Sequence, residues 1–581
     1  MKLNYSKAKY MVLGCFLSIQ LSAHAGSRAS PDFVLAADRI FSEADSPDKP
    51  ALAVALLQDG KVIYEKAFGS VNLEYKIPAT VDTKFQVDAL AWEFIAFATL
   101  MLEEQGKIKL NDDIRKYLPE LPDFGERMTI EHLLQSTDGL HGYKVLKALA
   151  GWEMRGAEQH KAILQLIQHQ KKLNFKPGSA FSPGGDTRLI LLAKIVEVAS
   201  GLPFDAYCKT HIFSPLGMRN TLFVYDSAVS LENTAAPYRN DGKGAYKQDH
   251  GGGNAAGPSN LYTSIKDIAL WRSNMSSHAV FKKSLLDKLN FPIRLDSGKI
   301  IKDISSISTY GQQHAGKERG IPKIYQMGNF GGYASSIFHF PEQKITAVTL
   351  SSGLAYNGSY GMRAAAILLE SQFTEPEKID YNNITRVEPN PGEFQKYVGN
   401  YWSPSRAIAT KIHIKNDHLH YTRTEGSEGR ELIYLGNARF QMKIEGDDEY
   451  IVQFVDQGVG TDMHFSMAGS DPVVFESYQP AAYAEHELAQ FSGVFYASEI
   501  DASFVFDVSQ GMLVANNMRT GTINFKPVSA DLFSGNKDFM AGIKFNRGDN
   551  DEITGFHVMV DEVRYLEFTK MRVAAERRLP L

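Results

Sequence analysis

Cysteine is nearly absent from this 581-residue sequence, which contains only Cys15 and Cys208. Cys15 lies in an N-terminal stretch that we expect to be removed, so no disulfide can form within the mature chain. The chain also has little excess of either charge. Its 62 basic and 67 acidic residues leave a formal charge of −5, spread along the chain. With no basic stripe, nucleic acid is not expected as a partner.

Long apolar runs and cofactor motifs are missing as well. No segment after the N-terminus reaches the roughly 20 apolar residues that span a bilayer. No HExxH-type spacing predicts a metal site, and Gly251-Gly252-Gly253 lacks the flanking strand and helix of a nucleotide-binding loop. We therefore expect no transmembrane span, no metal and no cofactor.

Residues 1–25 predict a secretory signal. Lys2, Lys7 and Lys9 form a basic start, Tyr10–Leu21 is short and mostly apolar, and Ala23-His24-Ala25 is a small-x-small cleavage site. The mature protein is therefore expected in the periplasm or outside the cell.

The rest of the chain divides by pattern into a mixed part and an all-β part. Residues 31–372 alternate strand-like and helix-like segments, which predicts an α+β domain with an antiparallel sheet flanked by helices. A proline-bearing polar linker is expected at 373–392. Short strands with turn signals follow in 393–480 and 481–581. Within the first part we expect strands at 51–57, 61–68 and 344–351, and helices at 92–105 and 189–199.

The all-β part repeats itself. Tyr397–Tyr401 recurs as Phe491–Phe495, and Met463-His464-Phe465 is echoed by Phe556-His557-Val558 at nearly the same offset. This spacing predicts duplication of one small β-barrel-like unit, and we expect the two copies to be structural or to contact a protein partner.

Five short motifs occur in order within residues 31–372. They are Lys61–Gly69, Ile130–Leu140, Ile212–Met218, Asn260–Ala269 and Gly332–Glu342. Together they resemble the β-lactamase-related serine hydrolases, which include class C β-lactamases, penicillin-binding proteins, D-aminopeptidases and esterases. The paired barrels likewise resemble the accessory, lipocalin-like domains of some exported relatives.

The resemblance implies a catalytic serine at a helix start, with a lysine three residues later on the same helical face. Here the matching stretch is Phe85–Trp92, so Ala89 stands at the serine position and Trp92 at the lysine position. A methyl group is no nucleophile, and an indole is no base. We expect Asp88 to cap this helix as its N-cap residue, with Val87 and Trp92 forming a hydrophobic staple.

The other two family motifs are altered as well. The tyrosine–asparagine loop aligns with Phe181–Asp186, where Pro183 replaces the tyrosine and Gly185 the asparagine. The strand motif, KTG or HxG in the family, aligns with Gln326-Met327-Gly328, where Gln326 stands in for histidine and Gly328 is kept. The reactive members of all three motifs are lost, which predicts no conventional acyl transfer.

A different set of polar residues could support acid/base chemistry instead. Glu93 lies four residues from Ala89, and other carboxylates and hydroxyls fall near the three motifs. Such a set would suit a lyase, isomerase or cyclase, whereas the structural alternative is capping, pairing or solvation of each group. The candidate residues are Asp88, Glu93, His141, Tyr143, Asp186 and Tyr333.

These observations favour an exported, non-catalytic homologue of the hydrolases that binds a small-molecule or peptide ligand of cell-wall type. The β units are expected to offer a surface for a protein partner. The alternative is an enzyme, acting either through the carboxylate set or as a residual hydrolase of peptides, esters or amides.

Overall fold

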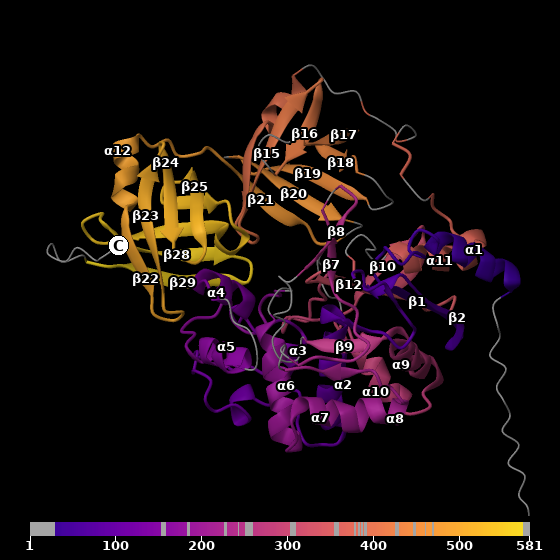
Figure 1. Ribbon diagram of the computed structural model, residues 1–581. Coiled ribbons are helices and arrows are strands. Elements are labelled where there is room, and N and C mark those ends of the chain that lie inside the picture. Colours follow the sequence, from indigo (N-terminus) through magenta and orange to yellow (C-terminus); the bar gives the residue numbers. More distant parts are fainter. Residues whose placement is uncertain are drawn as a thin grey trace, which may run out of the picture.

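A computed structural model describes the chain from residue 30 to residue 572 (Figure 1). The expected signal, residues 1–25, lies outside the described residues. Segments within this range that are not described are 153–157, 183–185, 226–228, 242, 250–259, 303–308, 354–358, 377–378, 382–383, 385–386, 388–391, 424–428, 445–448, 459 and 468–469.

The first domain is built on one antiparallel sheet with the strand order β10-β11-β12-β13-β1-β2. The central strands β1 and β13 are buried almost throughout, because helices cover both faces of the sheet. Asp59 and Gly60 both adopt positive φ in the turn that joins β1 to β2, as a tight hairpin requires. The strands are β1 (Leu52–Gln58), β2 (Lys61–Phe68), β10 (His314–Glu318), β11 (Ile321–Phe330), β12 (Tyr333–Phe340) and β13 (Ile345–Ser351).

Two layers of helices enclose this sheet. Helices α1 (Pro31–Phe41) and α11 (Ser359–Leu369) pack together on one face. Helices α2 (Asp88–Glu104) and α9 (Ile265–Ser277) lie on the other face, with α6 (Thr187–Ser200) packed behind α2. The other helices are α3 (Ile130–Leu134), α4 (Tyr143–Ala150), α5 (Glu158–Gln168), α7 (Phe204–Cys208), α8 (Ser214–Leu216) and α10 (Lys283–Asp287).

Two closed eight-stranded barrels follow, one drawn in orange and one in yellow in Figure 1. Each is filled by the alternate inward-facing side chains of its strands. The first barrel comprises β14 (Gly399–Ser403), β15 (Ile408–Lys415), β16 (His418–Thr422), β17 (Arg430–Gly436), β18 (Arg439–Met442), β19 (Tyr450–Asp456), β20 (Thr461–Met467) and β21 (Val473–Tyr478). The second comprises β22 (Gly493–Ala497), β23 (Ala502–Ser509), β24 (Met512–Asn517), β25 (Gly521–Ser529), β26 (Leu532–Gly535), β27 (Gly542–Arg547), β28 (Ile553–Val560) and β29 (Val563–Lys570).

The second barrel shares its apolar core with the first domain. Leu146, Leu149 and Ala150 of α4, together with Leu166 of α5, are buried in the same cluster as the phenylalanines of the barrel. Figure 1 shows α4 lying directly beneath strands β22 and β29. This shared core joins the barrel to the helices that lead from the Ile130–Leu140 motif to α6.

The predicted fold is confirmed, both for the helix-flanked antiparallel sheet and for the duplicated barrels. The expected strands and helices form within one to four residues of the predicted ends. Cys208 is a free, buried cysteine. In the part of the chain that the structure describes, no helix is both long and apolar enough to cross a membrane.

Candidate functional site

Helix α2 begins at Asp88, one residue earlier than expected. Val87 occupies the N-cap position with extended backbone angles and makes no side-chain capping bond, while Asp88 is the first helical residue. The expectation that Asp88 caps the helix is therefore wrong. The short strand β5 (Lys84–Gln86) pairs with β9 (Leu261–Ser264) and so holds the chain extended up to Val87. Nothing is described of the Asp88 side chain.

The first and third motif positions are in direct contact. Ala89 is almost fully buried, and a Cβ atom placed on Gly328 would lie 2.8 Å from the Ala89 Cβ atom. The Gln326 side-chain amide donates to the Ala89 carbonyl oxygen at 2.8 Å and to the Gln312 carbonyl oxygen at 3.1 Å. Strand β11 therefore lies against the start of α2, and only a glycine at 328 permits that approach.

Trp92 lies one helical turn after Ala89 and is half-buried. The guanidinium group of Arg188, from α6, lies 5.8 Å from the centre of its ring, within the range of a cation–π contact. Arg188 is fully buried and donates to the Gln312 side-chain oxygen at 2.8 Å. A cation thus lies beside the position where the family has its lysine, but a guanidinium group remains protonated and cannot act as a base.

The structure describes only part of the second motif, Phe181–Asp186. Pro183 and Gly185 lie outside the described residues. Ser182, just before them, donates its backbone N–H to the Ser136 carbonyl oxygen at 3.0 Å, which ties this loop to the Ile130–Leu140 motif. Asp186, just after them, is buried and forms an ion pair with Lys144.

His141 and Tyr143 lie at the junction with the second barrel. The His141 Nε2 atom hydrogen-bonds to the Arg564 carbonyl oxygen at 2.7 Å, so this nitrogen carries the proton. Burial lowers the pKa of His141 to about 4, and its imidazole is therefore neutral at pH 7. Tyr143 is buried at the start of α4, in the core of the first domain. Of the two, His141 therefore makes the direct contact with the barrel.

The turn between β28 and β29 brings Glu562 into this region. The Glu562 carbonyl oxygen accepts from the Gly142 N–H at 2.8 Å and from the Asn174 side chain at 3.0 Å. A Cβ atom on Gly142 would overlap the Glu562 carboxyl group, so glycine at this position makes room for it. Burial raises the pKa of Glu562 to about 7, the nearby Asp186 carboxylate adds to the rise, and Lys144 opposes it.

The remaining acid/base candidates lie elsewhere. Glu93 is buried between helices α2 and α9, where it forms an ion pair with Arg272 and accepts from the Trp271 indole at 3.3 Å. Tyr333 is buried at the start of β12 and donates to the Ala235 carbonyl oxygen at 2.7 Å. The structure therefore gathers His141, Tyr143 and Asp186 in one region, and it places Glu93 and Tyr333 in other surroundings.

Two residues of the site were not predicted from the sequence. Arg188 offered a signal, because it is a lone charge followed by the apolar run Leu189–Ala193, and such a charge must find buried partners. Glu562 offered no such signal in the sequence. It is one of two acidic residues in a hairpin turn, and it lies 376 positions after Asp186. Its role depends on how the barrel packs against α4.

The fold, with the start of α2 packed against β11, defines a serine-hydrolase architecture. The chain belongs to the β-lactamase family, whose sequence profile, described as "Beta-lactamase", matches residues 37–372.

Curated relatives agree with this assignment. Penicillin-binding protein 4* of Bacillus subtilis (strain 168) is 25% identical over 420 residues, covering 67% of this chain and 87% of that protein. A D-aminopeptidase of Brucella anthropi is 26% identical over 251 residues, covering 43% and 47%. Esterase EstB of Burkholderia gladioli is 30% identical over 217 residues, covering 35% and 53%.

Solved structures share the fold. An octameric penicillin-binding protein homologue from Pyrococcus abyssi superposes with a TM-score of 0.51 at 21% identity, covering 77% of this chain and 99% of that one. A structure titled SurE gives a TM-score of 0.52 at 16% identity, covering 77% and 98%.

Proposed function

We propose that this protein is an exported pseudoenzyme that binds a peptide-type ligand of the cell wall without acyl transfer. The observation that carries the proposal is the contact between Ala89 and Gly328, because it places a methyl group where α2 meets β11. That is the place where the family requires a hydroxyl group. The indole of Trp92 and the carboxamide of Gln326 supply neither a base nor a cation there.

The edge of the sheet supports binding of an extended peptide. Strand β10 pairs with β11 only from Ile321 to Tyr325. Among the described strands, none pairs with the outer edge of β11 beyond that point, and Met327 on this stretch is 44% exposed. A free strand edge can bind a peptide by main-chain hydrogen bonds. The names of relatives such as D-aminopeptidase point to peptides as the ligand class.

The absence of acyl transfer is tested directly with covalent probes. We expect the mature protein to remain unlabelled by fluorescent penicillin and to turn over neither nitrocefin, p-nitrophenyl esters nor D-amino-acid amides. Loss of the nucleophile alone lowers turnover by roughly a million-fold in a well-studied serine protease. Intact-mass spectrometry after incubation with the penicillin should show no adduct. A seryl adduct in residues 31–372 would contradict the proposal.

Binding is tested with a soluble muramyl peptide by calorimetry. Met327→Asp, which places a charge at the free edge of β11, is expected to weaken binding at least ten-fold. Met518→Asp, at a fully exposed methionine of the second barrel, is the matched control and should leave binding unchanged. Equal affinity of the two variants would exclude the edge of β11 as the binding site.

One observation favours a second function, acid/base catalysis at the domain junction. Glu562 titrates near neutral pH and lies beside the pair formed by Asp186 and Lys144. The test is a mass-spectrometric search for products from cell-wall digests. A product lost in both Glu562→Gln and Asp186→Asn, but formed by Glu567→Gln on the exposed side of β29, would establish this function. If no product depends on Glu562, this second function is excluded.

The raised pKa of Glu562 also predicts a pH dependence of stability. The folded state holds this proton up to about pH 7, whereas the unfolded chain releases it near pH 4.5. Protonation therefore stabilises the fold at low pH, and this contribution is lost as the pH rises through 7. We expect about 2 kcal/mol of it to disappear between pH 5 and pH 8.

Urea unfolding of the wild type and Glu562→Gln at both pH values measures this effect. The difference between the two proteins isolates Glu562 from other titrating groups such as His141, whose lowered pKa acts in the opposite direction. If the unfolding free energies of the wild type and Glu562→Gln differ by the same amount at pH 5 and pH 8, Glu562 is not protonated in the folded state at neutral pH.

A further inference from the structure

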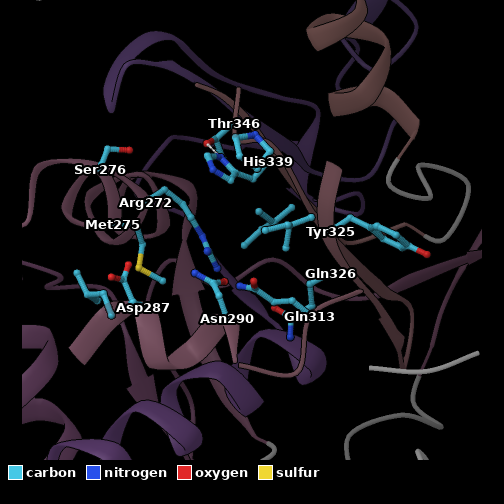
Figure 2. Close-up of a pocket in the computed structure, with 14 residues that line it drawn as sticks. Arg272, Met275, Ser276, Asp287, Asn290, Gln313, Tyr325, Gln326, His339 and Thr346 are labelled. Carbon is cyan, nitrogen blue, oxygen red and sulfur yellow. Dashed lines mark hydrogen bonds between the residues drawn. The ribbon is translucent and has the colours of Figure 1, made fainter. Parts of the chain in front are cut away.

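A cavity of about 180 Å³ lies between helices α9 and α10 and the inner face of β11–β13 (Figure 2). In this view His339 and Thr346 lie on one side, Asn290, Gln313 and Gln326 on the other, and Arg272 reaches between them from α9. A cavity of about 150 Å³ can hold a benzene molecule, so this one has room for six to eight non-hydrogen atoms. Gln326 is the one residue of the three catalytic motifs on its walls, while Ile337, His339 and Pro341 belong to the Gly332–Glu342 segment.

The polar groups around this cavity have unused hydrogen-bonding capacity. Arg272 is 93% buried, and one of its terminal nitrogens forms the ion pair with Glu93. Its Nε atom has no hydrogen-bond partner among the described residues. Gln313 is 95% buried, and only its backbone N–H makes a hydrogen bond in the described part of the chain. Buried groups of this kind normally have partners.

The charges around the cavity disfavour an ionic ligand. Glu93 already neutralises Arg272, and His339 is uncharged at pH 7, because burial and the Arg272 charge lower its pKa to about 4. Its Nδ1 atom shares a hydrogen bond with the Thr346 hydroxyl at 2.9 Å. Asp287 on the cavity wall is paired with Lys283 at 2.7 Å, so this pair adds no net positive charge. A carboxylate would therefore be buried without a partner of its own.

A neutral carboxamide matches the hydrogen-bonding groups that Arg272 and Gln313 leave available in the cavity. Its carbonyl oxygen can accept from the guanidinium group of Arg272, and its NH₂ group can donate to the Gln313 side-chain oxygen. Its hydrocarbon part can contact Leu286, Ile324 and Ile337, which line the same space. We propose that this cavity, which adjoins the Ala89 region through Gln326, is a second binding site for a small neutral carboxamide.

The test uses the full mature chain labelled with ¹³C at its methionine methyl groups. Met275 lines the cavity, and its signal is assigned with Met275→Leu. We expect isobutyramide to shift this signal saturably, with a dissociation constant on the order of 1–10 mM for so small a ligand. Isobutyrate, which has the same shape and one negative charge, should bind at least ten-fold more weakly.

Three variants test whether isobutyramide binds in this cavity and whether the Gln313 amide contacts it. Ile337→Phe fills the cavity and should abolish the shift, whereas Ile77→Phe, the same change at an exposed site, should preserve it. Gln313→Leu keeps the volume and removes the amide, and it should weaken isobutyramide at least ten-fold even if Ile337→Phe fails to fold. A cavity that holds only water would give no saturable shift. That result, or equal binding of isobutyramide to the wild type and Gln313→Leu, would overturn the proposal.

Discussion

Replacing Arg272 by methionine is expected to lower the free energy of unfolding by about 3–5 kcal/mol. Arg272 and Glu93 pair between α9 and α2, with 7% and 1% of their side chains exposed. Removing the guanidinium group leaves the Glu93 carboxylate buried with only the Trp271 indole as a donor. Urea unfolding followed by circular dichroism measures the loss.

Two further variants separate charge from packing. The double variant Glu93→Leu/Arg272→Met removes both charges and should recover most of the lost stability, because a buried pair can often be replaced by apolar side chains at little cost. Lys76→Met, at an exposed lysine whose partner Asp48 is also exposed, should change stability by less than about 1 kcal/mol. If the double variant is as unstable as Arg272→Met, packing rather than an unpaired charge explains the loss.

Placing a charge in the core shared by the first domain and the second barrel is expected to have a similarly large effect. Leu149 of α4 is fully buried against the barrel interior. Leu149→Asp should cost several kcal/mol, since a carboxylate in this apolar cluster has no partner. Hydrogen exchange should increase together in α4 and in strands β28 and β29, because these elements share one core.

The matched control for this prediction is Leu35→Asp on α1, where the leucine is 54% exposed. It should leave both stability and exchange close to the wild type. If Leu149→Asp increased exchange in α4 alone, while the barrel strands kept their protection, the barrel would not depend on the shared core.

Local sequence patterns were sufficient for most of the fold. Apolar periodicity located α2 and α6, and the Asp59-Gly60 turn located the hairpin of β1 and β2, because these signals act between near neighbours. The recurrence of Tyr397–Tyr401 as Phe491–Phe495 located both barrels for the same reason. The cap of α2 was predicted incorrectly. A capping propensity at Asp88 did not shift a helix start that is set by the pairing of β5 with β9.

The surroundings of the site could not be predicted in this way. Glu93, one turn beyond Ala89, was expected near the motif residues, yet it pairs with Arg272 on a helix more than 170 positions later. The lone charge of Arg188 indicated a need for buried partners without indicating which ones. Glu562 carried no local signal at all.

The sequence by itself determined which chemical groups stand at the three motif positions and which segments become helices, strands and barrels, because these depend on residue identity and on short-range spacing. Only the tertiary structure decided that Gln326 holds the Ala89 carbonyl group, that Glu562 lies beside Asp186, and that Arg272 faces an internal cavity. Such contacts join residues hundreds of positions apart, and their energies depend on burial and on partners that no local pattern specifies.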